Sequence, residues 1–89
     1  MVRSLEIFVM PDCPGDETAR RLAERVRTQA WRHVAVHLVD LSAPGAVRPQ
    51  AVFAVPTYSL DGRMLCLGNP EESWLLSRLA PTAPVDPED

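Results

Sequence analysis

Residues 5–17 read LEIFVMPDCPGDE, and this stretch gives the strongest indication of the fold. The run at positions 5–10 is short and almost entirely apolar, which favours a strand buried on both faces of a sheet. Pro11 ends that strand, and Pro14 suits the first turn of a helix that follows at once. Cys13 therefore falls between the end of a buried strand and the start of a helix.

A helix is predicted over residues 14–30, because apolar residues recur there at helical spacing and form one stripe. Its members are Ala19, Leu22, Ala23, Val26 and Ala30. The next segment, residues 34–40 (VAVHLVD), alternates its side chains between two faces and is predicted to be a second strand. A strand, a helix and a strand in this order favour a parallel crossover connection.

Two apolar segments at residues 53–60 and 63–67 flank Asp61-Gly62, which predicts a hairpin with a type I′ turn. Before them, Ser42 would cap one or two turns of helix that Pro49 ends, or the segment is an irregular loop.

The hairpin leads into a last helix. Asn69 is predicted as its cap and Pro70 as its first residue, with Glu72 completing a capping box. A single domain over residues 1–80 is expected, followed by a flexible acidic, Pro-rich tail at residues 81–89.

The composition excludes several classes of protein. The chain has 89 residues, a net charge of −3 and arginine as its only basic residue, which argues against a nucleic-acid partner. Arginine without lysine, with many alanines and prolines, is typical of a GC-rich, bacterial genome. No apolar stretch is long enough for a membrane span and no signal peptide is seen, so a cytoplasmic protein without a membrane partner is expected. Two cysteines are too few for a disulfide scaffold and are expected to be reduced.

Three motifs, in this order, resemble the thioredoxin superfamily, especially small thioredoxin- and glutaredoxin-like proteins. They are Pro11-Asp12-Cys13-Pro14, Val55-Pro56-Thr57, and Asp61-Gly62 followed by Gly68-Asn69-Pro70. The resemblance covers residues 5–80. It implies a thioredoxin-like three-layer α/β fold: a mixed four-stranded sheet of order 2-1-3-4, with helices on both faces and a shortened second helix.

The chain departs from that family at its redox motif, C-x-x-C. Here the run is Cys13-Pro14-Gly15-Asp16, so an aspartate stands where the second thiol would resolve a mixed disulfide. The C-G-F-S motif of monothiol glutaredoxins is absent too. Glutathione is therefore only one candidate for the external thiol. No other cofactor is expected.

Cys13 is the candidate nucleophile. A helix N-terminus favours the thiolate, whereas the neighbouring Asp12, Asp16 and Glu17 disfavour it, and the residue types leave the balance open. An inert, buried cysteine is the alternative. Asp16 is either a helix-stabilising acid or a proton acceptor beside the thiol.

By resemblance, the Val55–Pro56 bond is expected to be cis, with Pro14, Val55, Pro56 and Thr57 contacting an extended thiol or peptide substrate. The Val55 N–H and C=O would pair with that substrate strand.

Counting outward from the hairpin turn pairs Thr57 with Cys66. Cys66 is thus a possible second thiol, which could form a disulfide with Cys13. However, two strand spacings of about 4.8 Å each would separate the two residues by more than the Cα–Cα distance that a disulfide spans. The alternative is a packed strand residue. His33 and His37 would stand about 13 Å apart on a strand and cannot share a metal, so no metal site is predicted.

Two functions remain. In one, Cys13 exchanges thiols and disulfides with a protein or a small molecule, and an external thiol resolves the adduct. In the other, the fold is a binding or dimerisation module without catalysis. Either a monomer or a homodimer is compatible with the sequence.

Overall fold

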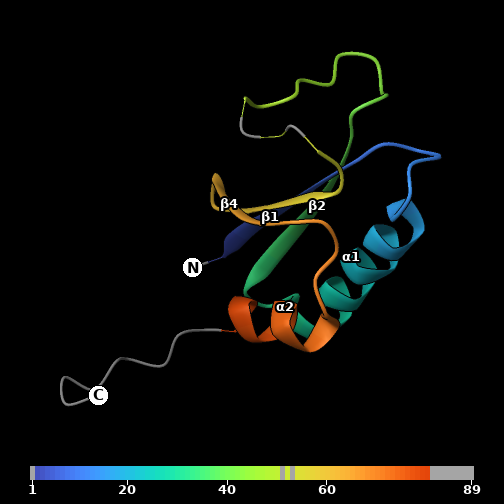
Figure 1. Ribbon diagram of the computed structural model, residues 1–89. Coiled ribbons are helices and arrows are strands. Elements are labelled where there is room, and N and C mark those ends of the chain that lie inside the picture. Colours follow the sequence, from blue (N-terminus) through green and yellow to red (C-terminus); the bar gives the residue numbers. More distant parts are fainter. Residues whose placement is uncertain (1, 51, 53, 81–89) are drawn as a thin grey trace.

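The computed structural model describes residues 2–50, 52 and 54–80, and its elements follow one another as β-α-β-β-β-α (Figure 1). The tail predicted for residues 81–89 lies outside the described residues. The elements are β1 (Arg3–Val9), α1 (Asp16–Ala30), β2 (Val34–Asp40), β3 (Thr57–Leu60), β4 (Arg63–Leu67) and α2 (Glu72–Leu79).

The four strands form one sheet in the order β2-β1-β3-β4, as predicted. β1 pairs with β2 in parallel and with β3 in the antiparallel sense, so Leu5 lies between Val36 and Leu60. The apolar run of residues 5–10 accordingly forms the greater part of a central strand. Ile7, Phe8 and Val9 are all buried there, on both faces of the sheet.

α1 carries the predicted apolar stripe, and all five of its members are buried. Burying a side chain such as Leu22 or Val26 stabilises the fold by about 1.5–3 kcal/mol. The helix begins at Asp16 rather than at Pro14, because Gly15, in the left-handed conformation (φ 90°), is its N-cap. At its outer side Arg25 donates two hydrogen bonds of 3.0 Å to the carboxylate of Glu72, which links α1 to α2.

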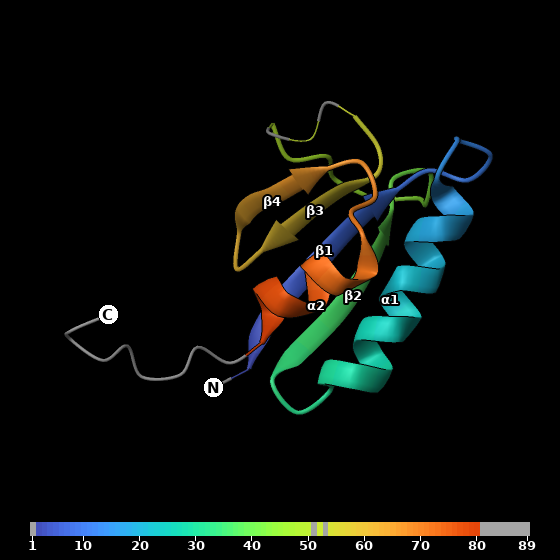
Figure 2. The same ribbon diagram turned by 60° about the horizontal axis from the view of Figure 1, so that its bottom comes forward.

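Both helices pack on the same face of the sheet (Figure 2). Their buried residues share one hydrophobic core with Leu5, Ile7 and Val9 of β1 and with Tyr58 and Leu60 of β3. The expectation of helices on both faces is wrong in the described part of the chain. Residues 42–50 form turns and irregular chain, which is the second of the two alternatives for this segment, and the shortened second helix is not formed there. The Ala46 N–H bonds to the carbonyl of Ala43 at 3.1 Å.

Among the described residues between β2 and β3, Pro49 and Val52 lie against the second face of the sheet. Pro44 and Pro49 account for the irregular chain, since each removes a backbone donor and together they leave too few residues for a stable helix. We call this second face, which carries Glu6, Phe8, Thr57 and Ser59, the open face.

The hairpin turn is formed as predicted. Asp61 and Gly62 both have positive φ angles, 52° and 84°, as a type I′ turn requires. The Asp61 carboxylate also accepts hydrogen bonds from the backbone N–H of Ser4 at 2.8 Å and from Arg3 at 2.9 Å. These bonds hold the pKa of the Asp61 carboxyl below its usual range, with the Ser4 N–H as the largest cause. They fix the hairpin to the start of β1.

The predicted capping box of the last helix is wrong. α2 begins at Glu72 with Glu71 as its N-cap and without a side-chain capping bond. Asn69 is used elsewhere, in a bond to the other helix that is described below.

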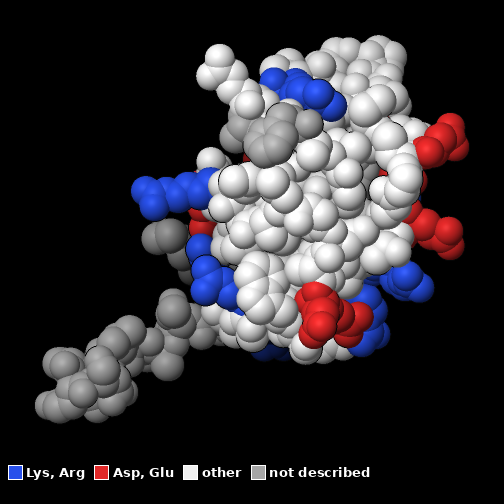
Figure 3. Space-filling view, viewed as in Figure 1, with Lys and Arg blue, Asp and Glu red and all other residues white. Residues whose placement is uncertain are grey.

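None of the helices among the described residues is long and apolar enough to cross a membrane. Charged side chains of both signs lie around the rim of one face of the molecule, with an uncharged area between them (Figure 3).

Candidate active site

Cys13 lies in the turn that connects β1 to α1. This position is compatible with a reactive thiol and with an inert cysteine. The Cys13 N–H bonds to the carbonyl of Met10 at 3.3 Å, and the Cys13 carbonyl accepts from the N–H of Asp16 at 3.1 Å. These two bonds fold the chain tightly just before the helix, and Asp12 takes a positive φ of 66° to allow it. The Cys13 side chain is half-buried, three residues before the first residue of α1.

The second part of the site is the loop before β3, where the Val55–Pro56 peptide bond is cis. Its conformation is held by the Pro56 carbonyl, which accepts from the N–H of Gly68 at 2.7 Å, and by the Thr57 hydroxyl, which donates to the Ala54 carbonyl. Pro56 and Thr57 are buried, and Val55 is half-buried.

The Cys13 turn and the Pro56 loop touch at Gly15. A Cβ placed on Gly15 would lie 3.4 Å from Cδ of Pro56 and 2.9 Å from Nδ2 of Asn69. Only a residue without a side chain fits at that distance, and the φ of 90° also requires glycine. The fold thus brings the turn that carries the predicted residues Cys13 and Pro14 close to the loop that carries Val55, Pro56 and Thr57, and the approach is made by Gly15, which the sequence analysis did not assign to the site.

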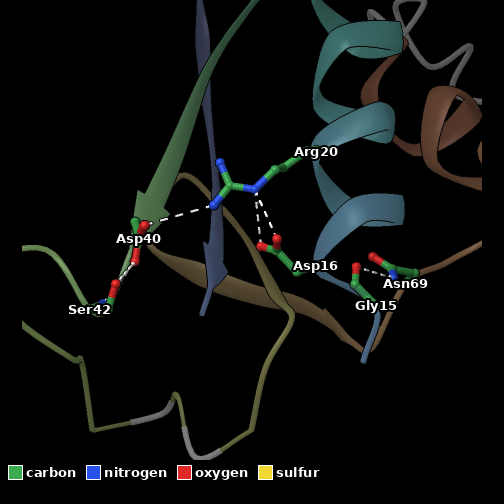
Figure 4. Close-up of polar contacts among 6 residues, drawn as sticks. All are labelled: Gly15, Asp16, Arg20, Asp40, Ser42 and Asn69. Atoms are coloured by element: carbon green, nitrogen blue, oxygen red, sulfur yellow. Dashed lines mark hydrogen bonds and ion pairs between the residues drawn. The ribbon is translucent and has the colours of Figure 1, made fainter. Parts of the chain in front are cut away.

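Asn69 joins these pieces. Its side-chain amide donates to the Gly15 carbonyl at 2.9 Å, and its side-chain oxygen accepts from the Tyr58 hydroxyl at 2.8 Å (Figure 4 shows the Gly15 bond). Burial raises the pKa of the Tyr58 hydroxyl well above its usual range, with Cys66 as a smaller cause. Tyr58 therefore stays protonated and remains a donor to Asn69.

Asp16, in the place of a second thiol, is held by ionic contacts. Both oxygens of its carboxylate accept from Nε of Arg20 at 3.1 Å, and Arg20 reaches Asp40 at the end of β2 at 3.7 Å (Figure 4). The hydroxyl and the N–H of Ser42 bond to Asp40 in turn, and these bonds lower the pKa of the Asp40 carboxyl. Asp16 therefore stabilises the first turn of α1 and connects it to the end of β2.

Comparison with known proteins supports the architecture. No protein-family model matches the chain, and no curated protein matches it in sequence. Among solved structures, thioredoxin O2 from Arabidopsis thaliana in its oxidized state is similar, with a TM-score of 0.66 and 19% sequence identity over 86% of this chain and 71% of that one.

The fold is thioredoxin-like. At 19% identity this likeness concerns the fold and carries no information about activity.

Within this thioredoxin-like fold, Cys66 does not lie where the sequence analysis placed it. The hairpin pairs Leu60 with Arg63 as expected, but an irregularity at Leu65 shifts the register, so that Cys66 faces Tyr58 and Thr57 faces Leu67. A β-bulge of one extra residue explains the shift, because two residues of β4 there oppose one residue of β3.

Cys66 therefore packs against the helix-covered core, and its S–H donates to the Gly68 carbonyl with an S···O distance of 3.8 Å. Burial raises the pKa of the Cys66 thiol. Both cysteines are unpaired thiols in the structure.

The described residues contain no group of three or more histidine, cysteine, aspartate or glutamate side chains that would hold a metal ion.

The sequence analysis missed two residues that build the site. Asn69 was assigned to helix capping, and Arg20 was given no role in the site. The spacing of Asp16 and Arg20, four residues apart on a helix, is a signal for an ion pair that the sequence does carry. The bond from Asn69 to Gly15 spans 54 positions and has no local signal.

Proposed function

We propose that the chain exchanges thiols and disulfides through Cys13 as a single attacking thiol. The observation that carries the proposal is the contact of the Cys13 turn with the cis-Pro56 loop at the N-terminal end of α1. Positive partial charge at a helix N-terminus favours the thiolate, which is the nucleophilic form of cysteine.

The exchange takes two steps. The Cys13 thiolate attacks one sulfur of a disulfide R–S–S–R′, so that a Cys13–S–S–R bond forms and R′–S⁻ leaves. An external thiolate then attacks the R sulfur of the mixed disulfide, forms a new disulfide with R, and releases Cys13 as a thiolate. No net oxidation of the protein occurs. The external thiol is needed because Asp16 supplies none, and in a reducing cytoplasm glutathione is one candidate.

The substrate would lie against Val55, Pro56 and Thr57, with Pro14 at its other side. Among the described residues, neither the N–H nor the C=O of Val55 has a hydrogen-bond partner. An extended chain beside the loop would pair with both groups, as strands do when they add to a sheet edge. The partner is accordingly a protein or small-molecule thiol or disulfide.

Asp16 does not need to move a proton in this scheme. Its carboxylate is engaged by Arg20 and is about one-fifth exposed, so its contacts favour a structural role. The variant Asp16→Asn separates the two roles, because it keeps an oxygen for Arg20 and removes the proton acceptor.

The second candidate function is a binding or dimerisation module without thiol chemistry. Two observations favour it: the acid that replaces the second thiol is built into an ion-pair network, and no helix of the described chain covers the open face. In that case Cys13 is an inert, half-buried residue.

The test is the alkylation rate of each thiol with iodoacetamide at pH 7, followed by mass spectrometry on the full chain. The variants Cys66→Ser and Cys13→Ser report Cys13 and Cys66 separately, with free cysteine as the reference. Thiol exchange requires Cys13 to react faster than free cysteine and to form a mixed disulfide with glutathione disulfide that added thiol releases.

A Cys13 that reacts more slowly than free cysteine, in a protein that is folded by circular dichroism, overturns the proposal in favour of the binding module.

A further inference from the structure

The open face of the sheet carries a pocket that shares Thr57 with the proposed substrate loop and is otherwise lined by residues without a part in the thiol exchange. Its volume is about 160 Å³, and it lies between the sheet and the segment that connects β2 to β3. Its lining comes from three strands, the hairpin turn and that segment: Glu6, Phe8, Pro49, Val52, Thr57, Ser59, Gly62 and Met64.

The floor of the pocket is set by strand register. Glu6 of β1 is paired with Ser59 of β3, and Ser59 is paired in turn with Met64 of β4, so their side chains stand in one row on this face. Phe8 and Thr57 form the next row. The pocket thus contains a carboxylate and a hydroxyl side by side, with apolar groups around them.

Ser59 is the hydroxyl that is available for a ligand. The residue is 9% exposed, and its hydroxyl has no hydrogen-bond partner among the described residues, yet it is not enclosed by protein. The hydroxyl of Thr57, in contrast, already donates to the Ala54 carbonyl. Because this hydroxyl is accessible from the pocket, a ligand there can form a hydrogen bond with it.

Glu6 is the charged group of the pocket. It is half-buried, and the ion pairs among the described residues use other carboxylates. Across the sheet its neighbour on β2 is His37, which forms no ion pair with it. A partly buried carboxylate beside apolar side chains is stabilised by a cation that donates hydrogen bonds to it.

The walls favour an apolar body on that cation. Phe8 and Val52 are 3% and 4% exposed, and Pro49 and Met64 complete the apolar lining. Sites for drug-sized ligands measure about 300–1,000 Å³, so this pocket suits a smaller molecule.

We propose that the pocket binds a small organic cation, a primary ammonium group on a short alkyl chain. The ammonium donates hydrogen bonds to the Glu6 carboxylate and to the oxygen of Ser59, and the alkyl chain packs on Phe8, Val52 and Met64. The site is independent of Cys13 and goes beyond the proposed thiol exchange.

The test uses n-butylammonium as the probe, titrated into the full chain at pH 8 and followed by ¹H–¹⁵N NMR. At that pH alkylamines, like lysine with its pKa of about 10.4, stay protonated. We expect saturable shifts at Glu6, Phe8 and Ser59, with a dissociation constant of about 1–10 mM. 1-Butanol, a neutral molecule of the same shape, is expected to bind about tenfold more weakly, and butyrate is expected not to bind.

The variant Glu6→Gln is expected to weaken n-butylammonium binding about tenfold. Glu71→Gln, at an exposed glutamate outside the pocket, is the matched control and leaves binding unchanged. Equal binding of the amine and the alcohol, retained binding in a folded Glu6→Gln variant, or the absence of saturable shifts would each overturn the proposal. If Glu6→Gln does not fold, the comparison of the three ligands on the natural chain decides alone.

Discussion

The side-chain amide of Asn69 donates a hydrogen bond to the backbone carbonyl of Gly15 at 2.9 Å. This bond joins the turn before α1 to the segment before α2, so the two helices are connected at their N-terminal ends. Because Gly15 lies two residues after Cys13, the position of the candidate thiol depends on a residue far away in the sequence.

Replacement of Asn69 by alanine is expected to lower the free energy of unfolding by about 1–3 kcal/mol, because it leaves the buried Tyr58 hydroxyl without its acceptor. Urea unfolding at pH 7 measures the effect. Ser77→Ala, which removes an exposed bond to the Trp74 carbonyl, is the control and should stay within about 0.5 kcal/mol of the natural chain. A similar loss in both variants would contradict the role given to Asn69.

Gly15→Ala is expected to destabilise the fold more than Gly45→Ala. Both glycines have positive φ angles, 90° and 81°, so both variants carry backbone strain of about 1–2 kcal/mol. Only at Gly15 does the new methyl group also meet neighbours, 2.9 Å from Asn69 and 3.4 Å from Pro56. Urea unfolding of the two variants compares them directly, and equal losses would show that the contact at Gly15 has no energetic weight.

Cys66 is expected to react with iodoacetamide more slowly than free cysteine at pH 7. Burial raises the pKa of this thiol, so its thiolate fraction at neutral pH is reduced. The Cys13→Ser variant, quantified by mass spectrometry, isolates the reaction. In urea sufficient to unfold the chain, the rate should rise to that of free cysteine, and a rate that is already equal in the native protein would be the contrary result.

Stability is expected to fall in acid partly through Asp61. The folded pKa of this carboxyl lies below its unfolded value of about 3.9, so its contribution is complete above that value and is lost as the pH falls through the folded pKa. Asp61→Asn should therefore be less stable than the natural chain at pH 7, with a difference that shrinks below about pH 4. Urea unfolding across pH 2–7 gives the two curves.

Asp12→Asn is the matched control for this experiment. Asp12 also has a positive φ, 66°, which asparagine tolerates, and it forms no ion pair with a described residue. If the loss of stability relative to the natural chain changes with pH equally in both variants, the contacts of Asp61 with Ser4 and Arg3 are not the cause of the pH dependence.

Local patterns predicted the parts of the fold that depend on neighbouring residues. The apolar stripe of α1, the buried run of β1 and the Asp61-Gly62 turn each follow from spacing or from a backbone conformation that few residues adopt. The resemblance of the motifs around Cys13 and Pro56 to the thioredoxin superfamily also indicated which two loops carry the candidate site.

Features that depend on distant contacts were not predictable in the same way. Asn69 has the right residue type and spacing for a helix cap, yet its partners Gly15 and Tyr58 lie far from α2 in the sequence. The bulge at Leu65 has no glycine to mark it, so counting from the turn gave the wrong partner for Cys66.

That bulge changes the side of the sheet that the side chains of β4 face after Leu65. Met64 and Cys66 are two positions apart and would share a side of any regular strand, but Met64 lines the pocket and Cys66 packs under the helices. The two sulfur atoms therefore lie on opposite faces of the sheet, so that a ligand in the proposed pocket contacts Met64 and not Cys66.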